Sequence, residues 1–128
     1  MALFDRYKPK TPQEKEEAKI FGSNYQLYRH DLDELAVMYK KLEKDKTFLK
    51  GTSQKHQLYL GLSEEEIFAV VFGFNMLTYF FQTHKDLPTN DFQLLLFGKF
   101  FSFPQKKTLT ILKRSRKVFD DYYQKKIL

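Results

Sequence analysis

The sequence predicts an all-α protein, a small bundle with about four main helices (12–46, 64–83, 91–101 and 104–126). Three observations support this prediction. Apolar residues recur at helical spacing over long stretches, capping signals precede the helical segments, and short loops with Gly or Pro separate them. The length of 128 residues fits one domain. We therefore expect residues 1–10 to form a loose N-terminal arm and residues 11–128 a single helical domain.

The first predicted helix, 12–46, begins at a capping box formed by Thr11 and Glu14. Its apolar positions then follow alternating three- and four-residue steps: Ala18, Phe21, Tyr25, Tyr28, Leu32, Leu35, Tyr39 and Leu42. This stripe keeps its register across Gly22-Ser23-Asn24, so we predict one continuous helix with at most a bend there. We interpret the stripe as a seam packed inside the bundle. A coiled-coil dimer is the alternative, which the tyrosines disfavour.

The second predicted helix, 64–83, has the strongest start signal. Ser63 and Glu66 can form a capping box, and Leu62 and Ile67 the matching hydrophobic staple. Its apolar run of 15 residues from Ile67 is too short for a roughly 30 Å hydrocarbon core, so we interpret it as the central core helix. Asn75 in that run is expected to bond a neighbouring helix. The first residues lack a signal-peptide pattern, and we expect a cytoplasmic protein.

The third predicted helix, 91–101, follows a cap at Thr89 or Asn90 and is apolar on every side. A bundle this small has room inside for one such helix, and 64–83 already fills that place. The excess apolar surface predicts contact with a partner, either a second copy of the chain in a homodimer or another protein. The residues predicted to make this interface are Phe92, Leu95, Leu96, Phe97, Phe100 and Phe101.

The last predicted helix, 104–126, concentrates the positive charge. Residues 103–128 hold eight basic and two acidic side chains, a balance of +6 that equals the net charge of the whole chain. Six basic residues share one arc of about 120°: Lys106, Lys107, Lys113, Arg114, Lys117 and Lys125. The pattern predicts an anion-binding face, and the favoured partner is nucleic acid. We expect binding without strong sequence preference, because the sequence contains no recognisable helix-turn-helix or other motif that recognises bases. Three alternatives stay open: the face could bind anionic lipid, it could bind an acidic protein, or it could simply be solvated.

The sequence contains few of the residues and motifs on which catalysis commonly depends. It has no cysteine and three histidines, and it lacks phosphate-binding loops and nucleophile motifs. We expect a non-enzymatic protein with no cofactor and no metal. His30 and Glu34 are interpreted as a solvated helix pair. Asp120 and Asp121 are expected to pair with basic neighbours on the same helix.

One short stretch suggests a different function. Leu35 to Lys46 (LAVMYKKLEKDK) resembles a helix in the small cytoplasmic immunity proteins that protect bacteria from their own peptide bacteriocins. Size, basic charge and helical content are also similar to that group. The resemblance implies a protein–protein interaction module, such as an immunity or inhibitor protein, whose basic face is merely solvated. It stands as the alternative to the nucleic-acid hypothesis.

Overall fold

The computed structural model describes residues 7–46 and 61–127, with side chains through residue 123. Helices and their connections make up this part of the chain, and it holds no strand, which confirms the small all-α bundle. The chain divides into two compact units, Met1–Val37 and Met38–Leu128. A single domain over 11–128 stays a prediction. Residues 1–6 of the predicted arm lie outside the described residues, and within 7–10 the Tyr7 N–H donates to Gln26 at 2.9 Å.

The first unit contains α1 (Pro12–Phe21), a 3₁₀ turn (Gly22–Asn24) and the start of α2 (Tyr25–Lys44). The predicted capping box of Thr11 and Glu14 is confirmed. The prediction of one continuous helix is wrong, because Gly22 ends α1 at φ 54°, a left-handed value that glycine adopts without strain. The apolar stripe keeps its register across the break because the Phe21 ring stacks on Tyr28 of α2, with 4.3 Å between centroids.

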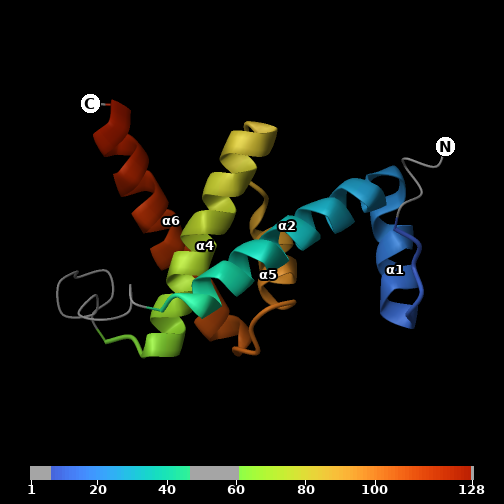
Figure 1. The fold of residues 1–128 in the computed structure, drawn as a ribbon, viewed down its shortest axis with the longest axis horizontal. Coiled ribbons are helices and arrows are strands. Elements are labelled where there is room, and N and C mark those ends of the chain that lie inside the picture. The colour runs from blue at the N-terminus through green and yellow to red at the C-terminus, as the bar shows by residue number, and fades with distance from the viewer. Residues whose placement is uncertain (1–6, 47–60, 128) are drawn as a thin grey trace. The chain divides into compact units, whose positions relative to one another are not determined.

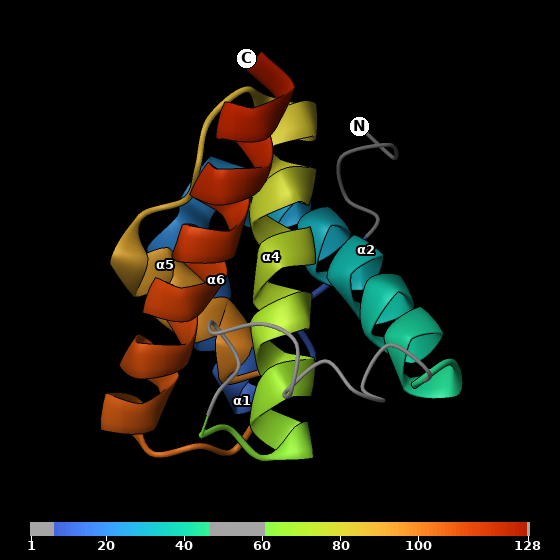
Figure 2. The same cartoon turned by 90° about the vertical axis from the view of Figure 1, so that its left-hand side faces the viewer.

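The second unit contains the end of α2, then α4 (Glu64–His84), α5 (Asn90–Phe97) and α6 (Gln105–Ile127). In Figures 1 and 2, α6 packs alongside α4, and α5 lies against α6. The predicted starts and ends of α4 and α6 are confirmed to within one residue. α5 ends four residues before its predicted end, and the chain then turns.

The turn after α5 explains where the excess apolar surface goes. The rings of Phe100 and Phe101 come back onto Phe72 of α4, at 5.0 and 5.5 Å between centroids. Leu96 and Phe97 are fully buried. The assignment of these two residues to a partner interface is therefore wrong, because they belong to the core of the chain itself.

The remaining residues assigned to that interface, Phe92, Leu95, Phe100 and Phe101, are half-buried. The large apolar side chains that the described residues do expose lie elsewhere: Ile20, Leu27, Val37, Phe81, Leu109 and Tyr122. The packing of α5 and of the turn after it thus buries much of the apolar surface of this segment within the chain itself. A partner contact through the four half-buried residues stays a prediction.

A close approach between α4 and α6 sets how α6 is rotated about its own axis. A Cβ atom added to Gly73 would lie 2.8 Å from the Cβ of Ser115, so only glycine fits there without a shift. The Ser115 hydroxyl, fully buried, donates a hydrogen bond to the Val70 carbonyl at 3.0 Å. Together these contacts turn one defined side of α6 toward α4.

Asn75 differs from the expectation. Its side-chain amide donates to the Val71 carbonyl of its own helix at 2.8 Å instead of reaching a neighbouring helix. Because the amide is satisfied one turn back, Asn75 needs no partner across the bundle.

Within the described part of the chain, no helix is both long enough and apolar enough to cross a membrane.

Candidate anion-binding face

The buried stripe of α6 defines its exposed side. The residues packed inward recur at helical spacing: Thr108, Ile111, Leu112, Ser115 and Phe119. At about 100° per residue, Lys106, Lys113 and Lys117 lie opposite Ser115. All three are exposed. The sequence therefore placed these three lysines on the correct side of the helix.

The three lysines form a row along α6. Lys106 and Lys117 are separated by about 16 Å of helix axis at about 1.5 Å per residue. Lys106 and Lys113 make no ion pair with any residue whose side chain is described. Lys117 is partly neutralised, since its Nζ lies 3.3 Å from Oδ1 of Asp121. Two full positive charges thus face solvent, with a third at the end of the row.

Lys107 and Arg114 lie on the flank of α6 that is closest to the start of α4. The Lys107 Nζ is 3.9 Å from Oε2 of Glu66. Hydrogen bonding by the Ser63 side chain lowers the pKa of Glu66, and the Ser63 N–H and the charges of Lys107 and Arg114 lower it further. Lys107 and Arg114 therefore face a carboxylate of their own chain and offer less free charge than the row. The side chain of Lys125 lies outside the described residues.

Arg116, on the opposite flank, was not assigned to the face by the sequence. Its Nε lies 3.0 Å from Oδ1 of Asp120, which confirms the expected pairing of the two aspartates with basic neighbours. Arg116 and Lys113 also border a cavity of about 210 Å³, with Asn90 and Gln93 on its far side. That cavity depends on α5 packing against α6, so the pattern of α6 alone could not reveal it.

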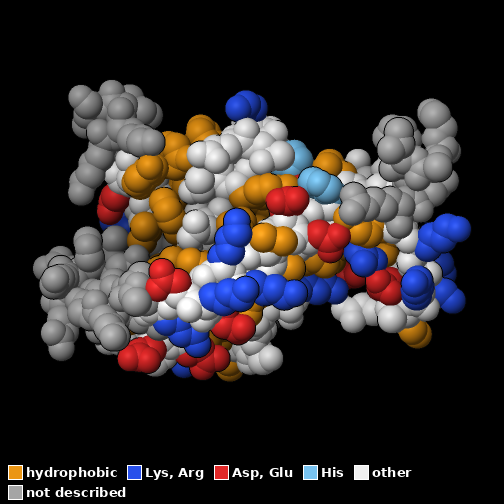
Figure 3. All heavy atoms as spheres, in the orientation of Figure 1, with side chains coloured by type: hydrophobic (Ala, Val, Ile, Leu, Met, Phe, Trp, Pro, Cys, Tyr) orange, Lys and Arg blue, Asp and Glu red, His pale blue; other side chains and the backbone are white. Residues whose placement is uncertain are grey.

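The face contrasts with other charged surface of the molecule. Over α2, Figure 3 shows Lys and Arg side chains interspersed with Asp and Glu. Exposed positions near the end of α2 include both signs, with Lys40 and Lys41 followed by Glu43 and Lys44. Segregated positive charge is therefore a property of α6 and not of every exposed helix.

Metal-binding geometry is absent from the described residues, which hold no cluster of three or more His, Asp or Glu side chains. His30 and Glu34 form an exposed pair at 3.9 Å, as expected for a solvated helix pair. His84 packs its ring near Phe80, at 5.5 Å between centroids. His56 lies outside the described residues.

Comparison with protein-family models, curated proteins and solved structures gives no match for this chain. A row of lysine ammonium groups can neutralise repeated anions.

Proposed function

We propose that this chain is a small non-enzymatic helical binding protein, located in the cytoplasm, whose helix α6 contacts nucleic acid without strong sequence preference. One observation carries the proposal: the exposed row of Lys106, Lys113 and Lys117 on a helix whose other side is fixed to α4 through Ser115. The lysines contact phosphates, and the packing of α6 on α4 holds the helix that carries them in place.

The chemistry of the row favours a phosphate backbone over base edges. Lysine is a compact point charge without the planar fork that arginine uses for bidentate contacts. Backbone phosphates repeat along a strand, so several lysines in a line can each meet one. Contacts of this kind position a protein but carry no sequence information. The two arginines of the region are Arg114, which faces Glu66, and Arg116, which is paired with Asp120.

The test compares two triple variants with the same change of charge. Lys106→Gln, Lys113→Gln and Lys117→Gln together remove the row. Lys40→Gln, Lys41→Gln and Lys44→Gln remove three exposed lysines of α2. Binding of labelled single- and double-stranded oligonucleotides is measured by fluorescence anisotropy over a range of salt concentrations.

The first variant is expected to weaken binding about ten-fold or more and to flatten the log–log salt slope by about 2 to 3, as three lost phosphate contacts require. The second is expected to change the slope little. Equal losses in both variants would mean that net charge alone attracts the polymer, and the face would be refuted. Unchanged binding in the first variant would do the same.

The alternative is a protein–protein interaction module with a solvated basic face, and one observation favours it. Phe81 and Tyr122 are each 41% exposed at the ends of α4 and α6. They continue a cluster of rings, with Phe81 at 5.1 Å from Tyr123 and Tyr122 at 5.5 Å from Phe74. Exposed aromatic clusters are typical of protein interfaces.

Such an apolar contact would respond little to salt, which separates it from phosphate binding. A homodimer through this cluster or through the half-buried residues of 92–101 is the simplest form of the alternative. Light scattering of the purified chain decides that form, because a mass of 15.4 kDa would exclude it. A twofold larger mass would support it.

A further inference from the structure

The cavity between α5 and α6 borders the row of Lys106, Lys113 and Lys117, but its lining differs in chemistry from that row. Its volume is about 210 Å³, below the roughly 300–1,000 Å³ of pockets that hold drug-sized ligands. The cavity therefore has room for a ligand of about one ring system. Lys113 belongs both to the row and to the wall of the cavity, so a group bound in the cavity lies next to a proposed phosphate contact.

Apolar and amide side chains make up much of the wall. Leu109 and Leu112 come from α6, and Asn90 and Gln93 come from the first turn of α5. Gln93 is buried, and its amide nitrogen donates to the Pro88 carbonyl at 2.9 Å, which fixes the side chain. Carboxamides both donate and accept hydrogen bonds, as the edges of nucleobases do. Leucines and amides together suit a nucleobase better than a bare anion, which has no apolar surface to bury.

Arg116 adds a planar group to the same wall. Its Nε donates to Oδ1 of Asp120 at 3.0 Å, and 53% of its side chain is exposed. The ion pair holds the guanidinium by one edge, and guanidinium planes are surfaces on which unpaired bases stack. Arg114 differs, because it faces Glu66 and does not line the cavity.

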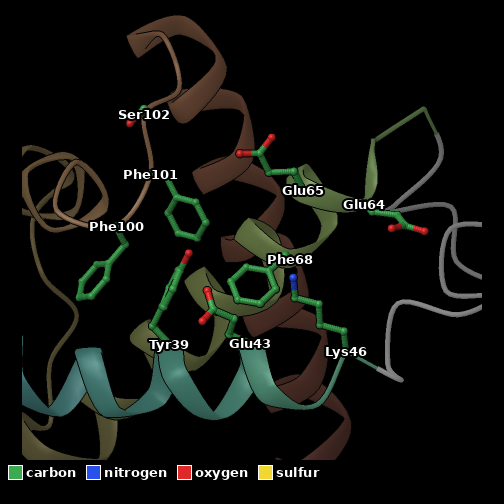
Figure 4. A pocket seen from close by; sticks show the side chains of 9 residues that line it. All are labelled: Tyr39, Glu43, Lys46, Glu64, Glu65, Phe68, Phe100, Phe101 and Ser102. Carbon is green, nitrogen blue, oxygen red and sulfur yellow. The ribbon is translucent and has the colours of Figure 1, made fainter.

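A second cavity of the same unit, of about 460 Å³, has the opposite charge and is shown in Figure 4. Glu43, Glu64 and Glu65 line it together with Lys46, and none of the three lysines of the row does. A nucleotide placed there would bring its phosphate close to three carboxylates. The charges around the two cavities therefore favour the smaller one, between α5 and α6, for a base that is attached to a phosphate.

We propose that the nucleic acid bound by α6 is single-stranded, and that one unstacked base enters the cavity between α5 and α6 while a neighbouring phosphate contacts Lys113. This inference rests on the proposed nucleic-acid function and deepens it. Bases in a duplex are paired and stacked, whereas those of a single strand can turn out of the strand and enter a cavity. Stacking tolerates every base because each has a π face, which agrees with binding that has little sequence preference.

The first experiment separates base contacts from phosphate contacts. Fluorescence anisotropy compares the binding of the full-length chain to a labelled oligothymidine strand and to a strand of the same length that carries abasic sites. The phosphates are the same in both, and the oligothymidine is expected to bind about three- to ten-fold more tightly because one base is stacked. Equal affinities would overturn the base site and leave the phosphate contacts standing. Failure of both strands to bind would instead refute the nucleic-acid function itself.

NMR locates the base without any substitution. The amide signals of Asn90 and Gln93 are expected to shift in a saturable way with oligothymidine and much less with the abasic strand. These two residues carry no charge and belong to α5, so phosphate contacts along α6 alone would not distinguish the two strands there. Shifts that are confined to α6 would place no base in the cavity and would overturn the proposal.

Two matched variants then test the role of Arg116. Arg116→Lys keeps the positive charge but removes the planar group, so it is expected to lower the ratio of the two affinities about two-fold or more. Binding of the abasic strand should stay unchanged. Arg114→Lys makes the same exchange on the other flank of α6, outside the cavity, and is expected to leave the ratio as it is. An unchanged ratio in Arg116→Lys, or an equal loss in both variants, would refute the proposal.

Discussion

The corner between α1 and α2 and the seam between α4 and α6 are held together by different forces. In the corner, Arg29 bonds Glu14 at 2.6 Å, and the Tyr28 hydroxyl donates to Glu17 at 3.1 Å. In the seam, Phe72 and the Gly73–Ser115 approach bury apolar surface almost without charge. The corner therefore depends on titratable groups, whereas the seam depends on shape. Substitutions that alter volume should act on the seam, and changes of pH should act on the corner.

The largest expected effect is in the seam. Phe72 is fully buried, and Phe72→Ala is expected to lower the free energy of unfolding by about 3–5 kcal/mol through lost burial and a residual cavity. Phe81→Ala, on the same helix but 41% exposed, is the matched control and is expected to cost much less. Urea denaturation measures both. Equal losses would show that α4 does not form the core.

Gly73→Ala tests the close approach directly. The added methyl meets Ser115, and overpacking of this kind costs about 1–3 kcal/mol, partly offset by the better helix propensity of alanine. Gly98→Ala is the control, since its nearest contacts are 3.5 Å and its φ is −63°. Adding Ser115→Gly to Gly73→Ala should recover part of the stability. A Gly73→Ala protein as stable as the parent would mean that the helices are farther apart.

The corner is expected to respond to smaller polar changes. Tyr28→Phe removes the hydroxyl that donates to Glu17, at a cost of about 1 kcal/mol, typical of one hydrogen bond. A double-mutant cycle with Glu17→Ala, which removes the acceptor, isolates this contact from the others that both residues make. A coupling energy near zero in urea denaturation would show that the ring stacking of Phe21 and Tyr28, and not the hydrogen bond, holds the corner.

Local signals in the sequence predicted the fold well. The capping boxes at Thr11 and Ser63 and the cap at Thr89 are confirmed, because caps depend on residues within one turn of each other. The break at Gly22 was missed because a ring stacked across a corner keeps the same apolar register as a continuous helix. The burial of Leu96 was missed because it depends on a turn that returns distant rings to the core.

The candidate sites divide in the same way. The side of α6 that carries Lys106, Lys113 and Lys117 could be predicted, since one helix's own periodicity defines it. The cavity beside Arg116 and the cavity of about 460 Å³ beside Tyr39, Glu43 and Glu65 could not, because each is made by segments that are far apart in sequence. Glu64 and Glu65 lie in the first turn of α4, and only packing places them on the same cavity as Tyr39.

The smallest expected effect concerns pH at the start of α1. Hydrogen bonds from the backbone of Thr11, then of Lys10, lower the pKa of Glu14 from 4.5 to about 2. Because the folded pKa lies below the ordinary value, this carboxylate stabilises the capping box above about pH 4.5. That contribution is lost as the pH falls toward 2. The amide NMR signals of Thr11 and Lys10 should therefore titrate with a midpoint near 2.

Glu14→Gln keeps an acceptor at the same place but cannot titrate, so in that variant the same amide signals should stay constant over this range. The Ser115–Val70 contact of the seam involves no ionisable side chain, and its signals should also stay constant. A midpoint near 4.5 for Thr11 would mean that the carboxylate is not bonded to the backbone in solution. The claim that the corner depends on titratable groups, in contrast to the seam, would then be refuted.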